Sequence, residues 1–126
     1  SLRRQRQMCI RDSLAYSGVP NLVSTFGYIN ASWTLRADLT AEWVCRMLNH
    51  MKAKGARSFT PRLRPEDTAM QARRWIEDFN PGYMERVMHL MPRQGDHEPW
   101  INPQNFKRDR KMFRKGPIED GVMVFD

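Results

Sequence analysis

The chain has 126 residues, of which 40% are hydrophobic and 28% charged, and its formal net charge is +7. This composition suits one small domain, and the sequence predicts no transmembrane segment, because no apolar run approaches the roughly 18 residues that a membrane span needs. Two cysteines are too few for a disulfide framework, so we expect a protein of the reducing cytoplasm. Cys45, inside the strongest helical pattern, is expected to be a small buried hydrophobe.

Residues 1–13 carry four arginines against one aspartate and have neither a helical nor a strand period. Three interpretations stay open for them. The first is a basic arm, and the second is a disordered end. The third is translated sequencing-adapter text that is not biological, because residues 7–13 resemble such text. We expect residues 1–13 to be a disordered or non-native end, followed by an extended stretch and a turn at Gly18–Asn21.

A strand and a long helix are predicted next. Residues 22–27 are short, apolar-biased and β-branched and end on a glycine, which indicates a strand. From position 35, apolar residues recur four positions apart, which predicts a helix over residues 33–54 with a wide apolar face. That face consists of Leu35, Leu39, Trp43, Val44, Met47, Leu48 and Met51.

The turn Gly27–Ser32, between this strand and this helix, is a candidate ligand site. The first N–H groups of a helix lack intrahelical partners and lie at the positive end of its dipole, so they suit an anionic or electron-rich cofactor edge. Ser32 is the expected N-cap of the helix, and Gly55 is the expected left-handed residue that ends it.

Five further elements are expected after the long helix. They are a short edge strand within residues 56–63, a charged helix over residues 65–79, a helix from Asn80-Pro81 to Pro92, a helix from Asn102-Pro103 to Arg114, and a last strand over residues 121–125. The expected inward residues of the two later helices are Met84, Val87, Met88, Met91, Phe106, Arg110 and Phe113.

The turn and the first helical residues, Gly27-Tyr28-Ile29-Asn30-Ala31-Ser32-Trp33-Thr34-Leu35-Arg36-Ala37-Asp38-Leu39, closely resemble one element of a known enzyme family. That element is the last strand-turn-helix of the flavin-binding domain in Baeyer–Villiger-type flavoprotein monooxygenases, and the likeness is to the ethionamide-activating type. Further matching marks run towards the C-terminus: Pro81-Gly82-Tyr83, Pro92-Arg93-Gln94-Gly95, Pro99-Trp100 and Gln104-Asn105-Phe106.

The resemblance implies a helix-rich α/β fragment from the C-terminal part of such an enzyme. Residues 14–55 would end its FAD-binding, Rossmann-like domain, and residues 56–126 would form a mostly helical C-terminal extension. The parent enzyme would use FAD and NADPH to insert one oxygen atom from O2 beside a ketone or onto a sulfur. The Gly-x-Gly-x-x-Gly turns that hold both nucleotides are missing here, so we expect this fragment alone to bind neither and to be inactive.

The same resemblance implies which residues would contact the FAD: Gly27, Tyr28, Asn30, Ser32 and Trp33. Gly27 would allow close backbone approach, and Trp33 would lean on the flavin. The N–H groups from Ser32 to Leu35 would face the flavin pyrimidine oxygen and favour the reduced, negatively charged ring. The catalytic residues of the family lie upstream, so none is expected here, and the three histidines have no metal-ligand spacing.

Residues 107–115 hold six positive side chains in nine positions, which leaves two interpretations open. They form either a phosphate-binding face, for nucleic acid or the NADPH 2′-phosphate, or a solvated basic surface. The alternative function is accordingly a small basic helical module that binds nucleic acid or a protein. We favour the enzyme, with a ketone or sulfide substrate, no nucleic-acid partner, and N-terminal domains of the same enzyme missing from this chain.

Overall fold

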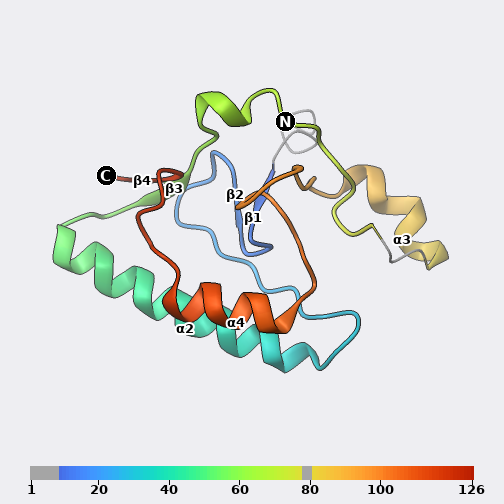
Figure 1. Cartoon of the computed structure of the whole chain (residues 1–126), viewed down its shortest axis with the longest axis horizontal. Helices are drawn as coiled ribbons and strands as arrows, with labels where there is room; N and C mark the ends of the chain where they lie inside the picture. The colour runs from blue at the N-terminus through green and yellow to red at the C-terminus, as the bar shows by residue number, and fades with distance from the viewer. Residues whose placement is uncertain (1–8, 78–80) are drawn as a thin grey trace.

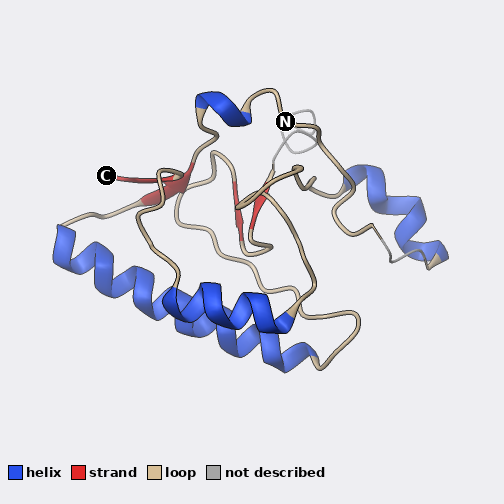
Figure 2. Cartoon of the chain, in the orientation of Figure 1, coloured by secondary structure: helices blue, strands red, loops and turns tan. Residues whose placement is uncertain are grey.

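The computed structural model describes residues 9–77 and 81–126 (Figure 1). Within them, three α-helices combine with two small antiparallel sheets, so the fold is a helix-rich α/β arrangement (Figure 2). The helices are α2 (Trp33–Lys54), α3 (Gly82–Val87) and α4 (Phe106–Lys115), and the paired strands are β1 (Ile10–Arg11) with β2 (Ala15–Tyr16) and β3 (Phe59–Pro61) with β4 (Met123–Phe125).

The predicted bounds of α2 are confirmed at both ends. Gly55 adopts the left-handed conformation with φ 73°, and its N–H donates to the carbonyls of Met51 and Lys52. Ser32 is the N-cap residue with extended backbone. Its hydroxyl, however, hydrogen-bonds to the Thr34 hydroxyl at 2.9 Å instead of capping a helical N–H.

The buried face of α2 is narrower than the sequence predicts. Trp43 is 1% exposed, whereas Leu35 is 36% and Leu48 56% exposed, so the last two are wrong as core residues. A helix has 3.6 residues per turn, and a spacing of four therefore drifts around the axis by about 40° per step. Arg36, not Leu35, continues the buried face towards the start of the helix.

Helices α2 and α4 lie side by side and run in the same direction (Figure 1). Two ion pairs fix this register, Arg36 with Asp109 and Glu42 with Arg114. The main hydrophobic core fills the space between α2, α4, the β1–β2 hairpin and the β3–β4 pair, and joins residues on both sides of position 55. Its members are Leu14, Ala15, Leu39, Trp43, Met47, Met51, Phe59, Phe113, Ile118 and Met123.

The expectation of a disordered end is wrong for residues 9–13. Ile10 and Arg11 pair with Tyr16 and Ala15 in a hairpin at the centre of the molecule, and residues 9–13 are all buried (Figure 1). Arg11 pairs with Asp120, more than a hundred residues away. Such distant ion pairs leave no period in the sequence, which explains the error. Residues 1–8 lie outside the described residues.

The strand predicted for residues 22–27 is also wrong. This segment is a loop, although the Ser24 N–H donates to the Leu14 carbonyl at 2.8 Å. A strand needs a neighbour that pairs along its length, and in residues 9–77 and 81–126 none lies beside this segment. Its β-branched residues fit a strand, but propensity alone does not create a sheet.

The charged segment from residue 65 is not the predicted helix. A 3₁₀ turn, Pro65–Asp67, is followed by irregular chain in which Arg73 exchanges backbone hydrogen bonds with Gln94 at 2.7 and 3.1 Å. Trp75 and Ile76 are buried there. The pairing with Gln94 satisfies backbone groups that a helix would have used, and so competes with helix formation. Residues 78–80 lie outside the described residues.

The start of α3 agrees only in part with the prediction. Pro81 is the N-cap residue, and the α-helix ends at Val87, where a 3₁₀ turn, Met88–Leu90, continues it. Asn80 lies outside the described residues. Val87 is exposed, which contradicts its expected inward position, whereas the three expected methionines pack against a small cluster around Trp75: Met84, Met88 and Met91.

Helix α4 begins at Phe106, so the predicted start at Asn102-Pro103 is three residues too early. Asn105 is the N-cap, and its side chain accepts the Arg108 N–H at 3.0 Å. The helix ends at Lys115, one residue beyond the predicted end at Arg114, and Gly116 is its C-cap residue. Phe113 is fully buried, but Arg110 is exposed, and Asp109 takes the inward position instead.

The two short strands predicted in the second half are confirmed as β3 and β4. They pair antiparallel with Thr60 opposite Val124. Among the strands of the described residues, β3 has one neighbour, which agrees with the edge position that Pro61 requires. In the described ranges, no helix combines the length and the apolar character needed to cross a membrane.

Candidate functional site

The five residues predicted to contact a cofactor divide into two groups in the structure. Gly27 and Tyr28, the first two residues of the turn, are buried. Asn30 and Ser32, farther along the turn, and Trp33, the first residue of α2, are exposed. The turn thus has an inner side, held by the protein, and an outer side that a ligand can reach. Trp33 has 48% of its surface exposed, and its indole covers the buried Gly27.

Gly27 is in contact with the indole of Trp33. A Cβ atom added at Gly27 would overlap the Trp33 ring, and the φ angle of Gly27 is not in the left-handed region. Trp33 in turn packs edge-on against Phe26, with 4.9 Å between ring centroids. The glycine is therefore needed here for close packing of the chain's own tryptophan.

The phenol of Tyr28 points into the protein and reaches α4. Its hydroxyl donates to Asp109 Oδ2 at 2.5 Å, and the Arg36 guanidinium lies 4.3 Å from the centre of its ring. Arg36 Nη2 also donates to Asp109 Oδ2, at 2.7 Å. Burial, followed by the hydrogen bond to Asp109, raises the pKa of Tyr28, so the phenol stays protonated and remains a donor.

Amide side chains hold the other half of the turn. Gln104 accepts the Ile29 N–H at 2.9 Å through Oε1, and its Nε2 donates to Asn102 Oδ1 at 3.2 Å. The same Asn102 oxygen accepts Arg36 Nη1 at 3.1 Å and the Ser13 hydroxyl at 2.5 Å. The loop before α4 and the hairpin therefore share one hydrogen-bond network with the turn.

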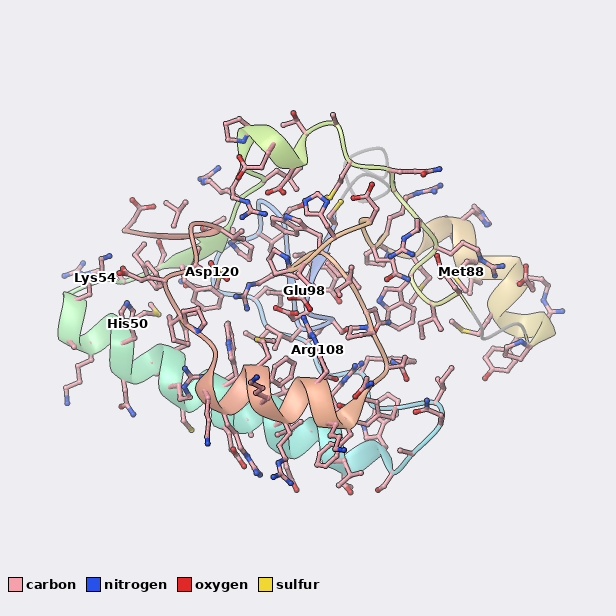
Figure 3. All side chains as sticks on the ribbon, in the orientation of Figure 1. His50, Lys54, Met88, Glu98, Arg108 and Asp120 are labelled. Atoms are coloured by element: carbon pink, nitrogen blue, oxygen red, sulfur yellow. The ribbon has the colours of Figure 1, made fainter. Side chains whose placement is uncertain are left out.

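A chain of charges, from the buried Asp109 and Asp12 to the exposed Glu98, extends this network through α4. Arg108 contacts Asp109 Oδ1 at 3.1 Å, Asp12 Oδ1 at 2.8 Å and Glu98 at 3.0 Å. Figure 3 shows Arg108 extending from α4 towards Glu98. Burial raises the pKa of Asp12, and the charges of Arg11 and Arg108 oppose that rise.

A pocket of about 340 Å³ opens beside the turn. Ile29 and Asn30 line one side, and the rest of the wall consists of Arg73, Ile76, Glu77, Gln94 and residues 101–104. Its polar groups are mainly neutral amides, which donate and accept hydrogen bonds without carrying charge. Across residues 9–77 and 81–126, no group of three or more His, Cys, Asp or Glu side chains is arranged to hold a metal ion.

The basic stretch on α4 is not uniformly available to a ligand. Arg108 is already bound to three carboxylates, and Arg114 makes two hydrogen bonds to Glu42, at 2.7 and 3.0 Å. The exposed positive residues that are left, such as Lys107 and Lys111, fit the interpretation of a solvated surface.

The sequence reasoning missed the residues that support the turn from behind, chiefly Arg36 and Asp109. A signal for each exists. Arg36 lies seven residues before Trp43, and Asp109 lies three after Phe106 and four before Phe113, so each charge falls on a buried helical face. A charged residue on such a face indicates a buried partner.

Comparison with known proteins finds several homologous monooxygenases. The FAD-containing monooxygenase EthA of Mycolicibacterium smegmatis is 44% identical over 112 residues, which cover 89% of this chain and 22% of that protein. EthA of Mycobacterium tuberculosis (strain H37Rv) is 41% identical over 125 residues, covering 95% of this chain and 25% of that protein. The probable FAD-binding monooxygenase AlmA of Acinetobacter baylyi is 38% identical over 110 residues, with 87% and 22% covered.

The match to the Mycobacterium tuberculosis protein covers so much of the chain that residues 9–13 lie inside the matched span. No protein-family model matches the chain, and no solved structure matches it. The chain spans about a quarter of the length of these relatives, and the matched part is their C-terminal part. The chain is therefore a homologue of the C-terminal part of the FAD-containing monooxygenases.

Proposed function

We propose that this chain is the C-terminal part of a flavoprotein monooxygenase of the Baeyer–Villiger type. The parent enzyme would use FAD and NADPH to insert one oxygen atom from O2 into a ketone or onto a sulfur. The observation that carries this proposal is the identity of 38–44% to FAD-containing and FAD-binding monooxygenases over most of the chain. The sequence around Gly27–Leu39, which resembles the flavin-binding element of that family, supports it.

The outer side of the turn is the part that we assign to the flavin. Asn30, Ser32 and Trp33 are exposed there, next to the unpaired N–H groups that begin a 22-residue helix. The Leu35 N–H is already bonded to the Ser32 carbonyl at 3.3 Å, so the N–H groups of Trp33 and Thr34 are the better donors to a flavin oxygen. The positive end of the helix dipole would favour the reduced, anionic ring.

We further propose the division into residues 14–55, as the end of a Rossmann-like FAD-binding domain, and residues 56–126, as a C-terminal extension. The second face of α2 supports the idea that α2 lies between two layers. A groove of about 660 Å³ runs along that face, between α2 and the loop before it. Its apolar walls include Val23, Ala41, Val44, Leu48 and Cys45. We assign this groove to the upstream part of the parent enzyme.

Cys45 is exposed, which contradicts its predicted burial, and it provides a test of that assignment. In this chain alone, a maleimide reagent should label Cys45 readily and leave Cys9 unlabelled, because Cys9 is buried. In the intact parent, labelling of Cys45 should slow at least about tenfold, since upstream residues would cover the groove. Mass spectrometry of the labelled peptides measures both rates. Equal labelling of Cys45 in the two proteins would rule out the covered groove.

Replacing Gly27 with valine in the parent enzyme should lower FAD affinity about tenfold, equivalent to about 1.4 kcal/mol. The new side chain would displace Trp33 from its place beside the turn. Gly82→Val is the matched control, because a Cβ at Gly82 has only the Arg86 side chain near it, at 3.8 Å. The measurement is the ratio of flavin to protein absorbance, with circular dichroism to confirm folding. A folded, fully flavin-loaded and active Gly27→Val enzyme would remove the turn from the flavin site.

We further propose that the parent enzyme works in the cytoplasm, because two cysteines are too few for a disulfide framework.

A further inference from the structure

We propose that Asp109, in the C-terminal extension, is a positioning residue for the flavin-facing turn. Together with Arg36 it holds Tyr28, and through Tyr28 the backbone of residues 26–30, in the shape that receives the flavin. This inference rests on the proposed function of the turn. It adds a role for the extension, namely that α4 fixes the geometry and the charge of a site to which α4 itself does not contribute a contact.

The first support is the way the contacts converge on one buried carboxylate. Asp109 is completely buried, and its Oδ2 atom accepts both the Tyr28 hydroxyl, at 2.5 Å, and Arg36 Nη2, at 2.7 Å. Tyr28 belongs to the turn, and Arg36 to the first turns of α2. One carboxylate therefore links the turn to the start of α2, and the relative position of these two segments sets the geometry at the amino end of the helix.

The second support is that the same arginine reaches the backbone at the residue just before the turn. Arg36 Nη1 lies 3.5 Å from the Phe26 carbonyl and 3.1 Å from Asn102 Oδ1. The Ile29 N–H is held by Gln104 on the other side. The chain is thus fixed at Phe26, just before the turn, and at residues 28 and 29 within it, and two of these three contacts run through the pair of Arg36 and Asp109.

The third support is electrostatic. Arg36 is 1% exposed, so its positive charge is stabilised by Asp109 rather than by water. Without that carboxylate, an uncompensated charge would lie near the positive end of the α2 dipole. Such a charge favours the reduced, negatively charged flavin, so Asp109 sets the field at the site as well as its shape.

The test compares two ion pairs that join the same two helices in the flavin-loaded parent enzyme. Asp109→Asn keeps the shape of the buried side chain but removes its charge. Glu42→Gln does the same to the exposed pair of Glu42 with Arg114, farther along α2. The readouts are the FAD dissociation constant, the midpoint reduction potential of the bound flavin and the melting temperature.

We expect Asp109→Asn to weaken FAD binding about tenfold and to shift the flavin potential to a more positive value, while Glu42→Gln leaves both unchanged. Tyr28→Phe removes one hydrogen bond and keeps the ion pair, so it should fold and weaken FAD binding by a smaller factor. It keeps the proposal testable if Asp109→Asn does not fold.

Each outcome has one meaning. If Asp109→Asn and Tyr28→Phe lower the melting temperature but leave the FAD affinity and potential as in Glu42→Gln, the network only stabilises the fold and the inference is wrong. If the wild-type parent binds no flavin, the proposed function fails first. If Gly27→Val loses flavin while Asp109→Asn does not, the proposed function stands and this inference falls.

Discussion

Replacing Trp43 with alanine should lower the free energy of unfolding of this chain by about 3–5 kcal/mol, the usual cost of truncating a buried large aromatic residue. Trp43 lies in the middle of α2 and is 1% exposed. It packs edge-on against Phe59, with 6.1 Å between ring centroids, and the Arg11 guanidinium lies 5.5 Å from its ring. The substitution would leave a cavity where α2 meets the hairpin and β3.

Urea denaturation followed by circular dichroism measures this loss. Trp33→Ala is the matched control, because it truncates the same residue type in the same helix at an exposed position. The control should cost less than half as much, since an exposed side chain has less packing to lose. Equal losses for the two variants would mean that the buried face of α2 has been assigned incorrectly.

Replacing Arg108 with methionine should also destabilise the chain by about 3–5 kcal/mol near neutral pH, because it takes one positive partner from each of two buried carboxylates and leaves Asp12 with only the more distant Arg11. Arg108 bridges Asp12 and Asp109, and both of these side chains are almost completely shielded from solvent. Methionine fills a similar space with an apolar chain, so the loss reports the charge more than the volume. Lys111→Met, at an exposed position on the same helix, is the control and should change stability by less than about 0.5 kcal/mol.

The Arg108→Met loss should shrink as the pH falls. Burial already raises the pKa of Asp12, and removing Arg108 takes away a charge that opposes the rise. A carboxyl whose pKa is higher in the folded state binds more protons when folded. Its contribution to stability is therefore complete below the unfolded pKa and is lost as the pH rises through the folded pKa. Unfolding measured from mildly acidic to neutral pH should show this slope, and a pH-independent loss would contradict it.

Local patterns predicted α2 and the two last strands because the information lies within each segment. The period of residues 39–51 and the glycine at position 55 define the helix without reference to the rest of the chain. The segment from residue 65 was predicted wrongly for the opposite reason. Its backbone pairs with Gln94, and no local pattern reports where a distant partner lies.

The candidate site shows the same division between local and distant information. Its position, at the turn before a helix, follows from Gly27 and the start of the period at residue 35. The residues that support the site cannot be predicted from the same local pattern, because Arg36 and Asp109 lie 73 positions apart and meet only in the folded chain. Reading Asp109 as an acidic residue on the face of Phe113 would have predicted burial, but not its partner.

The parallel arrangement of α2 and α4 has a consequence for the field around the molecule. Two helices that lie side by side and run in the same direction place both of their amino ends at one end of the pair, and each such end carries about half a positive charge. Aligned dipoles of this kind repel each other. Asp109, in the first turn of α4 and bonded to α2, supplies a negative charge at that end. The edge of the molecule where both helices begin thus combines concentrated partial positive charge with a built-in counter-charge.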